Sequence, residues 1–268
     1  MRISLGERLA FISAGVLTAL VFLVLYSPVI ISALFSALQT KQGVIQWNTI
    51  SFSPYFSLWS NESVLTALYN TGVVAVISVI VASVLSVALA LYTEWEGALG
   101  RRMLEVIIYI PFLLPPMVTG LALLVATAQL GVRRGLVTII VGHTIFVLAV
   151  TYRLVLTRLK SLPLSMIEAS ADLGASRMQT LRYVLLPHLA SALVTGGLLA
   201  ATLSFDETLI STFVAGDQTT LPLRLWAMMR VGFTPEINAL VTLVLLFSIM
   251  LALAAASRMQ PRGEPTED

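Results

Sequence analysis

The chain has 268 residues, of which 57% are hydrophobic and only 11% charged, with a net charge of +2 and no cysteine. A soluble domain carries about 25% charged residues, so polar side chains here are too few to cover a water-soluble globule. We therefore expect a protein of the lipid bilayer. The small net charge does not indicate nucleic-acid binding, and the lack of cysteine excludes disulfides and thiol chemistry.

Six stretches without a charged residue are long enough to cross a membrane as helices. They lie at 9–40, 63–93, 106–132, 135–152, 183–205 and 237–257. The first is too long for a cleaved signal peptide, so we interpret it as a retained span. None shows the strict alternation of a membrane β-barrel. The sequence predicts an all-α membrane protein with six transmembrane helices in one domain, 1–258, and a disordered cytoplasmic tail, 259–268.

Basic residues predict the orientation of the spans, because Lys and Arg gather on the cytoplasmic side. With the N-terminus inside, eleven lie inside and five outside. The inside set is Arg2, Arg8, Arg101, Arg102, Arg153, Arg158, Lys160, Arg177, Arg182, Arg258 and Arg262. The outside set is Lys41, Arg133, Arg134, Arg224 and Arg230. We expect both termini and the connector 158–187 in the cytoplasm, although Arg133 and Arg134 run against the rule.

Three local features modify this plan. The third span contains Pro111, Pro115 and Pro116, which remove backbone donors and predict a kink or break that borders a pathway or serves packing alone. The segment 41–62 is aromatic and suits either the membrane interface or an external partner; its rings are Trp47, Tyr55, Phe56 and Trp59. Small residues in later spans predict close helix packing; they are Gly120, Ala122, Ala126, Gly142, Gly196, Gly197, Ala200 and Ala201.

The part of this connector from 168 to 187 is a polar segment in an otherwise apolar chain. It reads EASADLGASRMQTLRYVLLP, where Gly174 permits a turn and Pro187 suits the first turn of the following helix. The sequence predicts two short helices with a sharp bend just before a span. Such a hairpin offers a surface to a soluble partner, although an ordinary amphipathic connector would have a similar composition.

The spacing of this connector resembles the EAA loop, E-A-A-x3-G-x9-I-x-L-P, of ABC importer permeases. Seven positions match, with Ser170 in place of the third residue and Val184 in place of isoleucine; the others are Glu168, Ala169, Gly174, Leu186 and Pro187. In that family the loop carries a coupling helix, which docks in a groove of the cytoplasmic ATPase. The resemblance implies a MetI-like fold with a coupling helix between spans four and five. The implied coupling residues are Glu168, Ala169, Ser170, Asp172, Gly174 and Pro187.

Asp206 and Glu207 end the fifth span in LSFDETLISTFVAG. Carboxylates at membrane depth are costly and are functional candidates by default. Neighbours on a helix point about 100° apart, so we expect at most one to face a pathway directly. Our hypothesis is that one of them attracts a cationic group in the substrate pathway. The other could pair with Arg224 or Arg230 or face the partner subunit. The alternative to a pathway role is a structural ion pair at the subunit interface.

The sequence contains no catalytic set. No Walker A pattern, G-x4-G-K-[ST], and no GxSxG elbow occurs. His143 is more typical of a hydrogen-bonded packing residue than of a ligand or proton relay, and His188 is expected at the interface. Two distant histidines without cysteine predict no metal site. The chain is therefore not expected to hydrolyse ATP or to bind a cofactor itself.

The blocks LSFDETLISTFVAG and TLPLRLWAMMRVGFTPEINAL also resemble the second permease of spermidine/putrescine-type importers. This resemblance implies a second homologous permease, two P-loop ATPase subunits that carry ATP and Mg, and an extracytoplasmic substrate-binding protein, in the bacterial inner membrane. Some polyamine permeases carry an acid where this chain has Pro116. Relatives that share these blocks are also assigned to aminoethylphosphonate, opines and other small solutes, so the resemblance does not identify the transported solute.

Two other classes compete with the importer. A channel or secondary transporter would couple ions through the carboxylates, but such proteins often contain inverted repeats, and none is evident here. An intramembrane enzyme would need a catalytic set. A neighbouring gene for a P-loop ATPase would discriminate between these readings.

Overall fold

The computed structural model describes residues 5–41, 44–95, 97–232 and 234–259. The predicted disordered tail, apart from its first residue, lies outside the described residues. The chain divides into two compact units. One contains the chain up to Glu62 together with Ala227–Ile249, and the other contains Ser63–Trp226 and the chain from Met250 onward.

The first unit begins with the helix α1 (Leu5–Ser36), followed by the strands β1 (Leu38–Lys41) and β2 (Val44–Ile50) and the helix α2 (Ser53–Trp59). The two strands pair antiparallel, with a register irregularity after Leu38. This small hairpin was not predicted. Its sequence signal is the β-branched and aromatic composition of VIQWNTI, which favours a strand.

Polar contacts tie this unit together. The Ser36 hydroxyl lies 2.6 Å from the Tyr55 hydroxyl, and Ser32 donates to the Asn238 side chain across 3.2 Å. Asn238 belongs to α12 (Pro235–Met259). Of the predicted interfacial aromatic residues, Phe56 and Trp59 are exposed, whereas the side chain of Trp47 lies outside what the structure describes.

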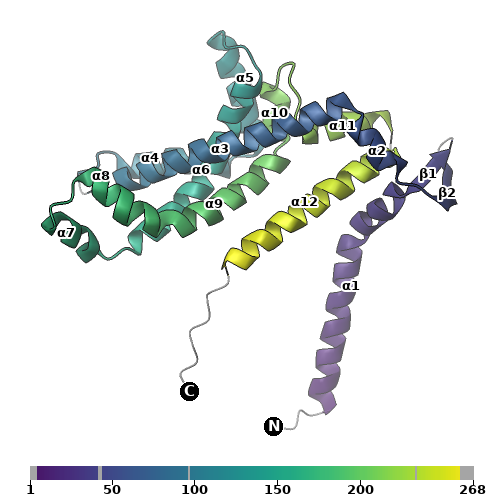
Figure 1. Ribbon diagram of the computed structural model, residues 1–268, viewed down its shortest axis with the longest axis horizontal. Helices are drawn as coiled ribbons and strands as arrows, with labels where there is room; N and C mark the ends of the chain where they lie inside the picture. The colour runs from purple at the N-terminus through teal and green to yellow at the C-terminus, as the bar shows by residue number, and fades with distance from the viewer. Residues whose placement is uncertain (1–4, 42–43, 96, 233, 260–268) are drawn as a thin grey trace. The chain divides into compact units, whose positions relative to one another are not determined.

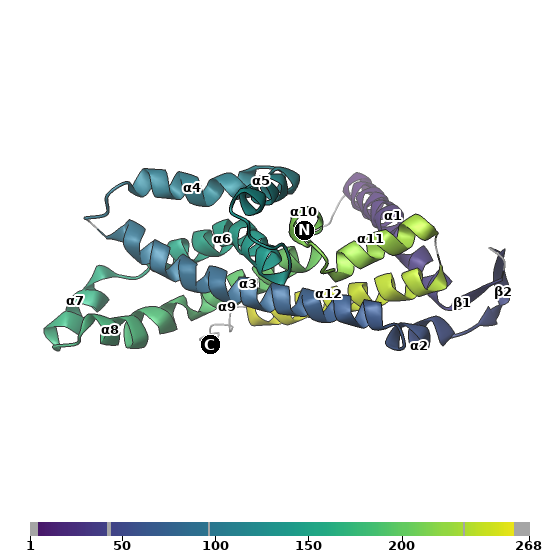
Figure 2. The same cartoon turned by 90° about the horizontal axis from the view of Figure 1, so that it is seen from above.

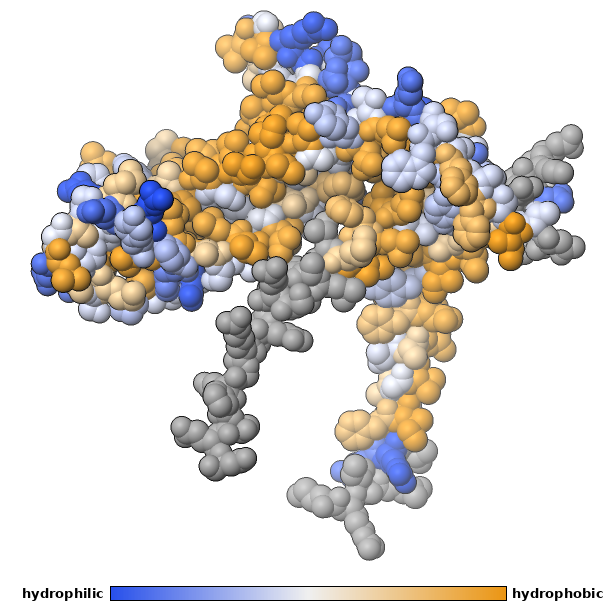
Figure 3. Space-filling model, viewed as in Figure 1, coloured by the Kyte–Doolittle hydropathy of each residue, from blue (hydrophilic) through white to orange (hydrophobic). Residues whose placement is uncertain are grey.

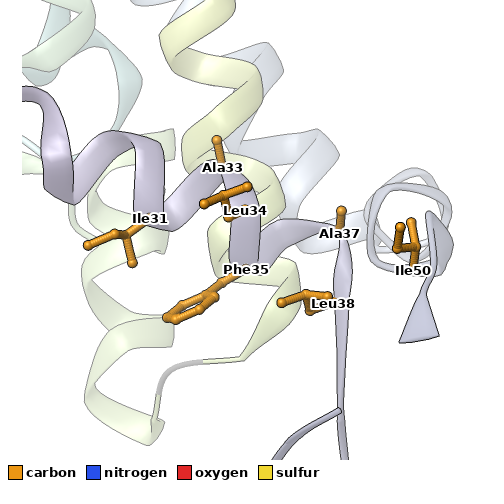
Figure 4. A pocket seen from close by; sticks show the side chains of 7 residues that line it. All are labelled: Ile31, Ala33, Leu34, Phe35, Ala37, Leu38 and Ile50. Carbon is orange, nitrogen blue, oxygen red and sulfur yellow. The ribbon is translucent and has the colours of Figure 1, made fainter. Parts of the chain in front are cut away.

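An apolar pocket of about 510 Å³ lies where α1 ends and β1 begins (Figure 4). Phe35 and Leu38 line it from one side, and Ile50 of β2 reaches it from the other. The pocket is lined only by carbon-rich side chains, which suits contact with lipid or another apolar surface.

The second unit holds the remaining helices (Figure 1). In chain order they are α3 (Glu62–Glu94), α4 (Arg101–Leu113), α5 (Pro116–Gln129), α6 (Leu136–Lys160), α7 (Leu164–Asp172), α8 (Arg177–Thr180), a π-helical turn (Leu181–Leu185), α9 (Leu186–Asp206), α10 (Leu209–Val214) and α11 (Leu221–Val231), whose last residues belong to the first unit.

The core of the second unit lies around α6, which packs along α9 and contacts α4 and α10 (Figure 2). Tyr152 and Leu189 are fully buried there. Buried hydroxyls also join the helices, with Ser86 of α3 lying 2.6 Å from Thr151 and Thr93 lying 3.0 Å from Tyr152. In lipid, such small side chains and interhelical hydrogen bonds replace the hydrophobic effect as the source of packing.

Four described helices are long and apolar enough to span a membrane: Gly6–Ser36, Glu62–Glu94, Leu136–Lys160 and Arg177–Asp206. The predicted third span is broken, since α4 and α5 meet at a bend of 108°. The predicted sixth span falls in α12, whose described apolar part, Pro235–Met250, is shorter than a span. The fold class is confirmed, while the count of six spans stays a prediction.

The break in the third span follows from its prolines. Leu114 has extended backbone, as expected before Pro115, and α5 starts at Pro116, where a missing N–H costs nothing. Pro111 lies inside α4. The predicted break is therefore confirmed, and it lies at the pair of adjacent prolines.

Pro187 lies in the first turn of α9, as expected, but the chain is already helical before it. The helix runs without interruption from Arg177 to Asp206, and a π-helical turn at Leu181–Leu185 precedes the proline. In a regular helix, the proline ring clashes with the carbonyl four residues earlier. The wider turn relieves that clash and lets the Leu186 N–H reach the Leu181 carbonyl.

Candidate functional site

The predicted bend of the connector is present between α7 and α8. Gly174 has a φ of 78°, a left-handed conformation that favours glycine. Its N–H donates to the Ala171 carbonyl at 2.8 Å, and the Ala175 N–H donates to the Ser170 carbonyl at 3.1 Å. These two bonds form a Schellman motif, which satisfies the last carbonyls of α7. The glycine thus ends one helix and turns the chain into the next.

Side chains hold the two helices of this hairpin together. The Ser170 hydroxyl lies 2.8 Å from the Thr180 hydroxyl, so the residue that departs from the family pattern forms the tie between them. At the start of α8, Ser176 and Gln179 form a capping box, with the Ser176 N–H donating to Gln179 Oε1 at 2.7 Å. The first contact joins α7 to α8, and the second fixes the start of α8.

The outer surface of the hairpin is exposed in the part of the chain that the structure describes. Glu168, Ala169 and Asp172 are exposed, whereas Ser170 is buried. Leu173 is 88% exposed and Met178 is 69% exposed on either side of the turn. In Figure 3, blue and pale residues gather over α7 and α8, while orange predominates over α3 and α4. Large apolar side chains within a polar, ordered hairpin suit a contact with another protein.

Beside the hairpin, the two long helices α6 and α9 are bonded to each other. Arg158 Nε donates to the His188 carbonyl at 3.0 Å, and His188 Nε2 lies 3.0 Å from the Arg158 carbonyl. His188 therefore helps to join the end of α6 to the start of α9, while its place at the membrane interface stays a prediction.

Sequence reasoning missed an ion cluster beside the hairpin. Glu94 Oε1 lies 2.7 Å from Arg101 Nη2 and 3.4 Å from Lys160 Nζ. These two ion pairs join the end of α3 to the start of α4 and the end of α6. Glu94 and Lys160 also line a cleft of about 880 Å³, together with Arg177 of α8. The only signal in the sequence was the charge at each helix end, which does not reveal which ends meet.

The structure separates the two carboxylates at the end of α9. Asp206 is exposed, whereas Glu207 is buried. Glu207 Oε1 accepts a hydrogen bond of 2.9 Å from the Ile210 N–H and so caps the start of α10. Among the described residues, neither Arg224 nor Arg230 forms an ion pair with either carboxylate. That one of them faces a substrate pathway stays a prediction.

His143 occupies a central place that sequence reasoning treated as packing. It is 1% exposed, and its Nδ1 lies 2.8 Å from Ser204 Oγ of α9 while its Nε2 lies 2.8 Å from Ser211 Oγ of α10. The imidazole is buried and hydrogen-bonded, as expected. What the sequence did not reveal is that both partners flank Asp206 and Glu207.

α10 is held closely against its neighbours by two of the predicted packing glycines. A Cβ on Gly142 would lie 2.5 Å from Ile210 Cγ2, and one on Gly120 would lie 2.8 Å from Phe213 Cδ2. Thr138 also donates to the Val214 carbonyl at 2.8 Å. The six-residue helix is thus fixed at its start, middle and end.

Comparison with known proteins places these features in context. The profile described as "Binding-protein-dependent transport system inner membrane component" matches residues 82–262. The chain is 32% identical to the spermidine/putrescine transport system permease protein PotC of Escherichia coli K12, over 90% of this chain and 91% of that protein. It is also 32% identical to the putrescine transport system permease protein PotI of the same strain, over 86% and 84% of the two chains.

Solved structures agree on the fold. A bacterial ABC transporter involved in the import of alginate matches with a TM-score of 0.74 at 18% identity, over 97% of this chain and 100% of that one. The MetNI methionine transporter matches with a TM-score of 0.60 at 21% identity, over 78% and 97%. The chain belongs to the family of binding-protein-dependent transport system inner membrane components.

Proposed function

We propose that this chain is the permease subunit of an ATP-driven importer and forms half of the translocation path for a small cationic solute, a polyamine such as putrescine or spermidine. The observation that carries this proposal is the 32% identity to a spermidine/putrescine permease over 90% of the chain. The exposed Asp206 supplies a negative charge that suits such a cation.

The hairpin is the proposed contact with the ATPase. Glu168, Ala169 and Asp172 are exposed on it, and Gly174 and Ser170 set its shape. It follows α6 along the chain and runs on into α9, and Arg158 bonds these two helices to each other. Closure of an ATPase dimer around ATP and Mg would therefore move these helices and reorient the path. The assembly would contain a second permease, two ATPase subunits and an extracytoplasmic binding protein, with both termini of this chain in the cytoplasm.

A second solute class has one observation in its favour. Pro116 begins α5, at the position where some polyamine permeases carry an acid. Part of a cation site would then be absent, which favours a zwitterionic or anionic solute such as aminoethylphosphonate or an opine.

The test is ATPase activity of the reconstituted complex with its binding protein, loaded in turn with putrescine, spermidine, 2-aminoethylphosphonate and an opine. We expect polyamine to stimulate hydrolysis, and Asp206→Asn to lower polyamine transport at least tenfold. Asp217→Asn is the matched control, because Asp217 is also exposed but pairs with Arg133 in a surface loop.

Stimulation by the phosphonate or the opine alone would replace the polyamine with the second solute class. Failure to co-purify with an ATPase subunit would contradict the importer assignment as a whole and reopen the channel reading.

A further inference from the structure

His143 is a buried ionisable side chain that links three elements at the one point where α9 ends. The imidazole projects from α6 and contacts Ser204 in the last turn of α9 and Ser211 in α10. A polar side chain buried in a span is costly unless its hydrogen bonds are made. Here both ring nitrogens are bonded, so the ring favours one arrangement of the three elements.

The contacts also connect the ring to the backbone of Glu207. Ser211 Oγ lies 2.8 Å from His143 Nε2 and 3.3 Å from the Glu207 carbonyl oxygen. Ser204 Oγ lies 2.8 Å from Nδ1, on the other side of the ring. The result is a hydrogen-bonded chain from Ser204 through His143 and Ser211 to the backbone of Glu207.

This hydrogen-bonded chain spans the junction of α9 and α10, where the two carboxylates lie. It fixes the Glu207 backbone from one side, while the Glu207 carboxylate receives the Ile210 N–H from the other. With Glu207 turned inward as a cap, its neighbour Asp206 is directed outward and is exposed. The arrangement therefore leaves the Asp206 carboxylate exposed and keeps the Glu207 carboxylate buried.

We propose that His143 is a positioning residue whose two hydrogen bonds hold the α9–α10 break so that Asp206, and not Glu207, is presented to the solute. The role of Asp206 toward the solute rests on the function proposed above. The positioning of Asp206 is a separate, structural claim and is measured separately.

The positioning is measured by thiol labelling, because the chain has no cysteine of its own. In the assembled complex, Asp206→Cys is labelled with a membrane-impermeant thiol reagent in the presence and absence of His143→Leu. We expect the leucine to change the labelling rate at least fivefold. Arg133→Cys is the control for reagent access, since the Arg133 side chain is 89% exposed in the loop between α5 and α6.

Transport provides the second readout. We expect His143→Leu to lower the maximal transport rate at least tenfold and to leave the KM for loaded binding protein unchanged, because the buried ring has no surface to offer that partner. His143→Gln should restore part of the rate, since its amide N–H can donate to Ser211. Thr144→Val is the matched control: Thr144 is the buried neighbour on α6, and its hydroxyl has no hydrogen-bond partner among the described residues.

The outcomes separate the two claims. A labelling rate at position 206 that His143→Leu leaves unchanged overturns the positioning role, whatever the solute. A changed labelling rate with unchanged transport by Asp206→Asn supports the positioning and removes the solute role of Asp206. If His143→Leu fails to assemble, Ser211→Ala cuts the same link with a smaller change, and an unchanged labelling rate in that variant overturns the inference equally.

Discussion

Gly142 shows how a single hydrogen in place of a methyl group decides the position of α10. A Cβ at this position would come within 2.5 Å of Ile210, closer than van der Waals contact allows, and Ile210 is fully buried. Ile210 is also the residue whose N–H is capped by Glu207. Any side chain on Gly142 would push against the start of α10 and the carboxylate bound there.

We expect Gly142→Ala to destabilise the complex by about 1–3 kcal/mol, the usual cost of overpacking a closed core. Thermal unfolding of the purified complex measures the effect. Gly72→Ala is the control, because nothing lies within 4 Å of a Cβ at that position. Adding Ile210→Ala to Gly142→Ala should recover part of the loss, and the absence of recovery would contradict the contact as its cause.

At the scale of elements, the hairpin and the buried junction differ in how far the sequence could predict them. The hairpin was predicted because its signals are local: a polar run, Gly174 at the turn and a proline beyond it. The partners of His143 lie 61 and 68 residues away. No pattern along the chain reports which serines meet a buried ring, and the same holds for the ion cluster around Glu94.

Gly174 offers a test of the hairpin as an element. Gly174→Ala should weaken the turn by about 1 kcal/mol, because alanine resists the left-handed backbone at φ 78°. Gly174→Asn should be milder, since asparagine adopts this conformation more readily. The measurement is the number of ATP molecules hydrolysed per solute transported. Equal ratios for alanine, asparagine and glycine would show that the bend is not needed for coupling.

For the whole molecule, composition and charge-free stretches predicted the all-helical membrane fold correctly, because lipid imposes the same requirement on every span. Composition and charge-free stretches predicted less about where the helices are interrupted. The prolines of the third span predicted a kink or break but not its angle of 108°. The strands β1 and β2 were not predicted, since β1 falls at the end of the first charge-free stretch and β2 falls in the segment 41–62, which was interpreted by its aromatic residues alone. Predicted orientation rests on Lys and Arg alone and can be measured directly.

The topology is tested with single cysteines in the cysteine-free chain. Leu173→Cys, at an 88% exposed position of the hairpin, should react with an impermeant thiol reagent only in inside-out vesicles. Arg133→Cys should react only from the opposite side in intact spheroplasts. Reaction of both from the same side would overturn the orientation, and the hairpin would then be unable to meet a cytoplasmic ATPase.

The π-helical turn before Pro187 has a geometric consequence for the hairpin. It contains one residue more than an α-helical turn, and each residue of an α-helix rotates the chain by about 100°. The segment Arg177–Thr180 is therefore out of phase with α9, although the two form one continuous helix. The direction in which the hairpin points around the axis of α9 is thus set by the number of residues in the turn, and not by their identity.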